Sequence, residues 1–233
     1  MGASGGPSIV HDGLVLGVDA ADKNSYIGSG TTWTDLSPNG NNGTLTNGPT
    51  FDSGNGGTIV LDGSNDYITV NQVDSQTYTI SIWFKLDALP TSGNFIVLLR
   101  QGYSPVNYAL YISDAGNVYT YGIGSGGNHF TDTSIALATN NWYNIAHVKN
   151  WSSSKESVYL NGLLQYGESS FSAGSYSFNN SSQTYNYTDI SRNVSNNNSF
   201  VDGKIANCVI YNKILNANQI LENFNAQRHR FGV

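Results

Sequence analysis

The sequence predicts an all-β domain, and three observations lead to this prediction. Short alternations of apolar and polar residues recur from Ile9 onward, separated by clusters of Gly, Asn, Ser and Asp. The composition includes 26 glycines and 15 tyrosines but only 11% charged residues, which favours strands and tight turns over long helices. The length of 233 residues allows one β-sandwich with a sizeable core.

The strand patterns are short and spread along the whole chain. The clearest are at residues 14–19, 58–61, 67–70, 78–86, 95–100, 108–113, 117–122, 142–149, 158–161, 185–191 and 204–211. Within 78–86, alternation puts Tyr78 and Ile82 on one face and Trp83 among polar residues on the other, which predicts a half-exposed sheet. Turn-forming residues at 114–117 and 161–162 predict hairpins.

One helix is predicted, at about residues 216–228. Asn216 can serve as its N-cap, with Gln219 three residues on, and Leu215 is placed to pack on Ile220. The basic residues at 228–230 fall where cations favour a helix C-terminus, so they need no ligand to explain them. Residues 1–8 are expected to form a flexible or partner-ordered tail.

The charge balance argues against nucleic acids and membranes as partners. The formal net charge is -6 and the sequence pI is about 4.9, and the ten lysines and arginines form no stripe that could neutralise phosphates. No stretch approaches the roughly 20 apolar residues of a membrane span. The first eight residues also lack the charged start and apolar run of a signal peptide. We therefore expect no nucleic-acid binding and no membrane insertion.

Several segments resemble a known family in their order and spacing. Residues 61–67, 78–83, 141–148, 158–162 and 202–215 are similar to the laminin-G-like branch of the concanavalin A-like lectin/glucanase superfamily. The resemblance implies that residues 9–233 form a single jelly-roll domain of two stacked antiparallel sheets. Together with the residue patterns, it predicts a two-sheet antiparallel jelly-roll sandwich with one short C-terminal helix.

A narrower resemblance concerns the two ends of the chain. Residues 13–19, 28–37 and 223–232 look like structural proteins of tailed bacteriophages, especially marine ones. This likeness implies a capsid decoration or fibre-type module at the virion surface, made in the host cytoplasm without a signal peptide. Its expected partners are other virion proteins or further copies of itself, and host glycans are a further candidate. A stand-alone carbohydrate-binding lectin is the alternative, and a glucan-active glycoside hydrolase is the third hypothesis.

Catalysis by this chain is not expected. The superfamily includes glycoside hydrolases, and a retaining hydrolase needs two carboxyl groups about 5 Å apart. The chain has three glutamates: Glu156 in a Ser/Lys-rich segment interpreted as a loop, Glu168 after a strand end, and Glu222 on the helix. None belongs to a closely spaced acidic motif, although an Asp pair brought together by folding stays open. His147 alternates within a strand and is interpreted as sheet surface.

Calcium is the one metal for which the sequence offers candidate ligands, and we expect that no cofactor is required. The segment 35–40 resembles the start of an EF-hand loop, with Asp35 and Asn39 as oxygen ligands, but Thr46 replaces the bidentate Glu, and turn chemistry favours an Asx turn over a calcium site. The family resemblance implies a second candidate site at Asp19 and Asp202.

The candidate ligand-binding residues are mostly aromatic. Tyr111, Tyr119 and Tyr121 can share one face of a hairpin, and Trp151 and His129 are expected in flanking loops. Flat rings and hydroxyl groups suit the faces and edges of sugars, whereas tyrosines on a sheet suit a protein contact as well. Glycan contact and protein contact therefore both stay open.

Overall fold

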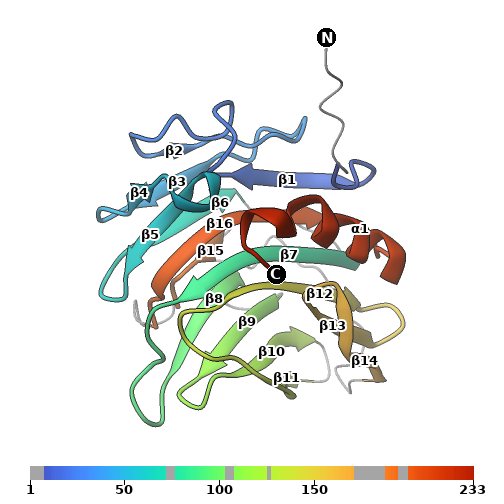
Figure 1. The fold of residues 1–233 in the computed structure, drawn as a ribbon. Helices are drawn as coiled ribbons and strands as arrows, with labels where there is room; N and C mark the ends of the chain where they lie inside the picture. The colour runs from blue at the N-terminus through green and yellow to red at the C-terminus, as the bar shows by residue number, and fades with distance from the viewer. Residues whose placement is uncertain (1–7, 72–76, 103–107, 125–126, 171–186, 194–198) are drawn as a thin grey trace.

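The computed structural model describes residues 8–71, 77–102, 108–124, 127–170, 187–193 and 199–233. These residues form two antiparallel β-sheets that stack as a sandwich, with one α-helix near the C-terminus (Figure 1). The predicted all-β fold class is confirmed. The prediction that residues 1–8 form a tail falls largely outside the described residues.

The first sheet, called sheet A, has the strand order β14-β13-β12-β7-β16-β5-β4, and β1 also pairs with β16. Its strands are β1 (Leu14–Asp19), β4 (Thr50–Asp52), β5 (Thr58–Asp62), β7 (Thr77–Leu86), β12 (Trp142–Asn150), β13 (Lys155–Leu160), β14 (Leu163–Ser170) and β16 (Asp202–Tyr211). The short strand β4 was not predicted from the sequence, and for β14 the predicted hairpin at 161–162 gave no bounds. Residues 155–157, interpreted as loop, belong to β13.

The second sheet, called sheet B, has the order β11-β10-β9-β8-β15-β6-β3-β2. Its strands are β2 (Thr32–Trp33), β3 (Gly43–Thr46), β6 (Tyr67–Asn71), β8 (Phe95–Gln101), β9 (Tyr108–Ser113), β10 (Asn117–Gly124), β11 (Gly127–Ala136) and β15 (Tyr187–Ile190). Both predicted hairpins form, because β9 pairs with β10 and β13 pairs with β14. Strands β2, β3 and β11 were not predicted.

The main core lies between the two sheets. Alternate residues of the central strands point inward and are fully buried, as Ile80 and Ile82 of β7 and Ile112 of β9 show. Burying such side chains contributes about 1.5–3 kcal/mol each. The single cysteine, Cys208, is buried and forms no disulfide. Packing in this layer therefore supplies most of the stability of the domain.

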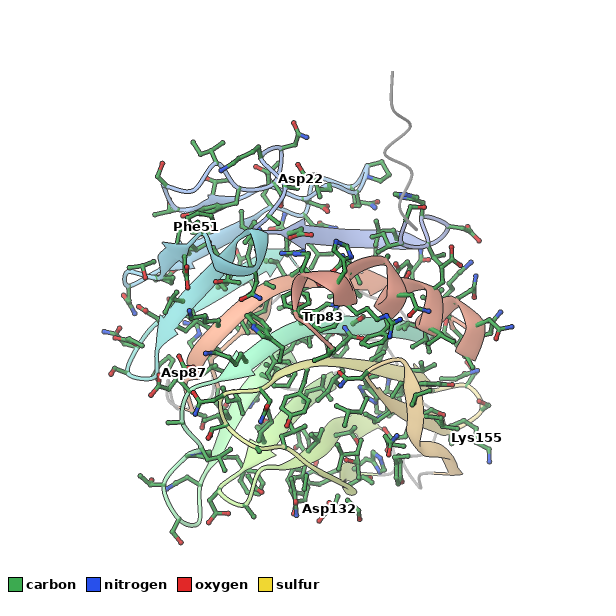
Figure 2. All side chains as sticks on the ribbon, in the orientation of Figure 1. Asp22, Phe51, Trp83, Asp87, Asp132 and Lys155 are labelled. Carbon is green, nitrogen blue, oxygen red and sulfur yellow. The ribbon has the colours of Figure 1, made fainter. Side chains whose placement is uncertain are left out.

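The outer face of sheet A is covered, which corrects the prediction of a half-exposed sheet. Trp83 is only 2% exposed, and its ring stacks on Phe224 at 5.5 Å and on Phe231 at 4.2 Å (Figure 2). These two rings come from α1 (Ala217–Gln227) and from the residue after the 3-10 turn η3 (Arg228–Arg230). The C-terminal segment therefore closes this face of the sheet.

The helix begins as predicted. The Asn216 side chain accepts a hydrogen bond from the Gln219 amide, and the Gln219 side chain accepts one from the Asn216 amide, forming a capping box. Leu215 and Ile220 belong to the same buried cluster. Within the described ranges, no helix has the length and apolar character that a membrane span requires.

Both ends of the described chain meet on the outer face of sheet A. The Asn223 side chain on α1 accepts a hydrogen bond from the Val10 amide at 2.8 Å, and the Tyr211 hydroxyl donates to the Val10 carbonyl at 2.9 Å. Figure 1 shows β1, which follows these residues, and the C-terminal helix on the same side of the molecule. Neither end of the described chain lies on the outer face of sheet B.

Candidate ligand-binding surface

Five aromatic rings gather on the outer face of sheet B, and we call them the aromatic surface. They are Phe95 on β8, Tyr111 on β9, Tyr119 and Tyr121 on β10, and Phe130 on β11. Strand register brings them together, since Tyr119 lies opposite Tyr111, and Tyr121 lies opposite Phe130. The prediction that the three tyrosines share one face is confirmed.

The rings support one another in stacked and edge-to-face contacts. The Tyr119 and Phe130 rings stack with their centroids 4.9 Å apart and an angle of 11° between them. Phe95 meets Tyr119 edge to face at 5.2 Å. Phe130 is 49% exposed, whereas Tyr111 is 9% exposed. Such contacts hold the rings in fixed orientations, so the exposed part of the surface is rigid before any ligand arrives.

The hydroxyl groups of this surface are held by charged neighbours. The Arg100 guanidinium donates to the Tyr111 hydroxyl at 3.2 Å, and the Tyr119 hydroxyl donates to the Asp132 carboxylate at 2.9 Å. Burial raises the pKa of the Tyr111 and Tyr121 hydroxyls, and the hydrogen bond to Asp132 raises the pKa of Tyr119. All three phenols therefore stay protonated, and the Tyr119 proton is already donated to Asp132.

A buried charged network lies beneath this hairpin, between the two sheets. The Glu156 carboxylate on β13 contacts Nε2 of His129 at 2.6 Å, Nε2 of His147 at 3.2 Å and Nζ of Lys149 at 3.4 Å. It also accepts a hydrogen bond from the Thr120 hydroxyl at 3.1 Å. The Glu156, His147 and Lys149 side chains are fully buried. The interpretations of Glu156 as a loop residue and of His147 as sheet surface are therefore wrong.

The network fixes the charge states of its members. Burial alone would raise the pKa of Glu156, but the hydrogen bonds with His129 and His147 and the charge of Lys149 hold that pKa well below its usual range. Burial lowers the pKa of His147 and of Lys149, and Glu156 partly opposes both shifts. The carboxylate is therefore charged and sealed from solvent, and its chemistry is structural.

Two predicted ligand contacts point into this interior rather than onto the aromatic surface. His129 lies in strand β11, not in a flanking loop, and its ring contacts Glu156 and the Thr131 hydroxyl. Trp151 lies in the turn after β12, but it is 2% exposed and packs under the Lys149 ammonium at 4.5 Å from the ring centroid. Burial removes Trp151 from direct contact with a ligand on the outer face.

Comparison with known families supports the fold. A family model described as the concanavalin A-like lectin/glucanases superfamily matches residues 62–221, more than half of the chain. The chain belongs to this superfamily. A sequence comparison with curated proteins finds no match.

Solved structures of this type share the fold at low sequence identity. Domain 4 of AbnA, an extracellular arabinanase from Geobacillus stearothermophilus solved with arabinotriose, is 20% identical with a TM-score of 0.68, covering 90% of this chain and 97% of that one. The binding domain of botulinum neurotoxin serotype D is 18% identical with a TM-score of 0.70, covering 94% of this chain and 53% of that one. Trypanosoma rangeli sialidase in complex with sialic acid is 15% identical with a TM-score of 0.67, covering 99% and 35%. This chain thus spans about half of the toxin domain and about a third of the sialidase.

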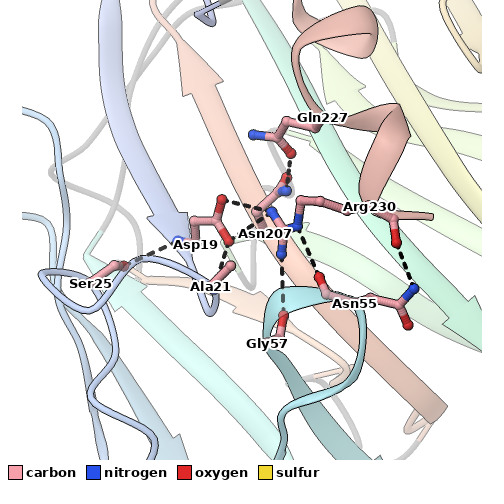
Figure 3. Close-up of polar contacts among 8 residues, drawn as sticks. All are labelled: Asp19, Ala21, Ser25, Asn55, Gly57, Asn207, Gln227 and Arg230. Carbon is pink, nitrogen blue, oxygen red and sulfur yellow. Dashed lines mark hydrogen bonds and ion pairs between the residues drawn. The ribbon is translucent and has the colours of Figure 1, made fainter. Parts of the chain in front are cut away.

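The calcium ligands that resemblance to the superfamily implied do not come together. Asp19 lies opposite Asn207 along β16, whereas Asp202 lies opposite Asp62. Both oxygens of Asp19 accept hydrogen bonds from Arg230, at 2.9 and 3.0 Å, and Arg230 also donates to the Asn55 and Gly57 carbonyls (Figure 3). A guanidinium already occupies the place of a cation, so the prediction of one site at Asp19 and Asp202 is wrong.

The second candidate calcium loop forms a turn that uses its own oxygens. The Asp35 carboxylate accepts hydrogen bonds from the Gly17, Ser37 and Asn41 amides, all at 2.8 Å, and from the Ser37 hydroxyl. Asn39 donates through its side-chain amide to the Ser37 hydroxyl. The oxygens of Asp35 are therefore engaged as in an Asx turn, and the residues do not fit a calcium ion. Among the described residues, no group of three or more His, Cys, Asp and Glu side chains could hold a metal.

Proposed function

We propose that this domain is a non-catalytic carbohydrate-binding module and that its aromatic surface contacts the sugar. One observation carries the proposal: a preformed cluster of rings stands on the outer face of sheet B, with Phe130 half exposed and phenol hydroxyls among the rings. Sugars present apolar C–H faces and polar edges. Rings provide contact area for the faces, and fixed hydroxyls provide directional hydrogen bonds for the edges.

The position of the surface is also suitable for binding. The helix, the residues around Val10 and the C-terminal Phe231 lie on the outer face of sheet A, away from the aromatic surface. A larger assembly can therefore hold the domain by its ends while the rings of sheet B face outward. Solved structures of the same fold include an arabinanase domain in complex with arabinotriose and a sialidase in complex with sialic acid, and this supports a sugar ligand.

The absence of catalysis is part of this proposal. The Glu156 carboxylate is enclosed between the sheets and makes three contacts with cationic or imidazole groups, so it has no path to a glycosidic bond. Asp66, whose pKa is raised by burial and by the charge of Asp62, is itself buried. A general acid needs a raised pKa together with contact to the substrate.

The proposal is tested by screening the protein on a glycan array and then titrating it with the sugar that binds most strongly. We expect Phe130→Ala and Tyr121→Ala each to weaken binding about tenfold, the equivalent of about 1.4 kcal/mol of lost ring contact. Leu163→Ala is the matched control, because Leu163 is 61% exposed on β14 of the other sheet and its loss should change nothing. Binding of no sugar, or equal binding by all variants, contradicts the proposal, as does release of reducing sugar from the bound ligand.

We further propose that the module is displayed on the surface of a phage virion. The resemblance of the two chain ends to tailed-phage structural proteins motivates this role, and it is supported by the packing of both ends on one face. Co-sedimentation of the purified protein with capsids that lack it is the measurement. We expect stable attachment to particles, and a protein that stays in the supernatant as a monomer would exclude this role.

A further inference from the structure

A pocket lies directly beside the aromatic surface. It is a pocket of about 560 Å³ at the end of the sandwich, formed by the β5–β6 and β7–β8 connections and by the residues before β16. Phe95 belongs to both features, because it lines the pocket and its ring lies 5.2 Å from Tyr119 and 5.6 Å from Phe130. A chain-like ligand on the rings can therefore extend into the pocket without crossing open solvent.

The pocket combines ring surfaces with hydrogen-bond acceptors. Phe95 and Phe200 supply the rings. The Asn94 side chain donates to the Thr91 hydroxyl at 2.9 Å, and its Oδ1 atom accepts no hydrogen bond within the described residues. The Asp202 carboxylate likewise forms no hydrogen bond or ion pair there. Such acceptors need donors, and sugar hydroxyls are donors that fit beside rings.

The charge of the pocket is one-sided. Asp62 and Asp202 lie directly opposite each other in the pairing of β5 with β16, where side chains are about 5 Å apart. Backbone amides of Ser64, Asn65 and Asp66 hold the pKa of Asp62 below its usual range, so this carboxylate stays ionised. No Lys, Arg or His is among the described residues that line the pocket.

We propose that this pocket receives the end of an uncharged oligosaccharide whose following units lie on the aromatic surface, and that it rejects sugars bearing a carboxylate. The proposal rests on the proposed carbohydrate-binding function and specifies its ligand class. An acidic sugar would place a third negative charge beside Asp62 and Asp202, whereas a neutral sugar offers hydroxyl donors to the same oxygens. The preference for neutral sugars therefore follows from the side-chain oxygen acceptors and from the lack of Lys, Arg and His among the described residues that line the pocket.

The test uses an array of neutral oligosaccharides, each printed beside the same oligosaccharide with a terminal sialic or uronic acid. We expect the wild-type protein to bind the neutral members at least tenfold more tightly. Asp202→Asn should lower this ratio at least threefold, because it removes one charge and keeps the side-chain shape. Asn94→Ala should weaken binding of the neutral members about tenfold. Asp87→Asn is the control, since Asp87 pairs with Lys85 outside the pocket and should leave the ratio unchanged.

The outcomes separate this inference from the proposed function. Binding that depends on Phe130 but is equal for acidic and neutral sugars would overturn the inference about the pocket and leave the proposed carbohydrate binding intact. The same holds if Asp202→Asn and Asn94→Ala change nothing. If the wild-type protein binds no sugar, both proposals are overturned. A preference that shrinks in Asp202→Asn and persists in Asp87→Asn supports the pocket as the end-binding site.

Discussion

Replacement of Glu156 with leucine is expected to lower the free energy of unfolding by about 3–5 kcal/mol, the usual cost of removing one partner from a buried charged group. Glu156 is the acceptor shared by His129, His147, Lys149 and Thr120, and it joins strands of both sheets. Leucine fills a similar volume but leaves buried donors without the carboxylate that they face. Urea unfolding followed by tryptophan fluorescence measures the loss.

A combined variant separates the effect of charge from the effect of shape. In Glu156→Leu with His147→Leu and Lys149→Met, the buried carboxylate, imidazole and ammonium groups are removed together, and apolar groups take their place. We expect this triple variant to be more stable than Glu156→Leu alone, because no desolvated ammonium faces an apolar side chain. A loss below about 1 kcal/mol in the single variant would show that the network contributes little.

The architecture of this domain follows largely from local patterns in the sequence. Period-two alternation predicted most of the strands, and the capping residues Asn216 and Gln219 predicted the start of the helix. The same alternation across a tight hairpin brought Tyr111, Tyr119 and Tyr121 to one face. These features depend on neighbours within a few residues along the chain, which is the range that such patterns describe.

The sequence-based predictions of burial were wrong where residues far away in the sequence cover a side chain. Trp83 stands among polar neighbours on β7, and it is buried only because Phe224 and Phe231 return from the end of the chain. His147 and Glu156 look like surface residues, yet they satisfy each other inside the sandwich. Phe130 was missed because β11 has polar inward residues, such as His129, whose partner Glu156 lies on another sheet. Residues 128–133 do alternate with Phe130 on one face, but they were not predicted as a strand, and His129 was placed in a loop.

Acidification is expected to destabilise the domain, and His147 gives the steepest contribution above the carboxylate range. Burial lowers the pKa of His147, so the folded protein keeps this ring neutral while the unfolded chain binds a proton below about pH 6.5. The unfolded state then binds more protons, and His147 lowers the free energy of unfolding by about 1.4 kcal/mol per pH unit as pH falls from about 6.5 toward its folded pKa. Asp19 and Asp66, whose pKa values burial raises, act in the opposite direction at lower pH.

Matched variants isolate the contribution of His147 from these opposing groups. His147→Gln retains an amide donor toward Glu156 but cannot take up the proton, so its stability profile between about pH 6.5 and pH 5 should be flatter than that of the wild type by about 1.1 kcal/mol per unit on average. His229→Gln makes the same substitution at an exposed position on the 3-10 turn and is the matched control. Chemical unfolding at a series of pH values supplies both slopes. Equal slopes for His147→Gln and the wild type would mean that the ring binds its proton as readily in the folded protein as in the unfolded chain, because the carboxylate of Glu156 offsets the cost of burying the charge.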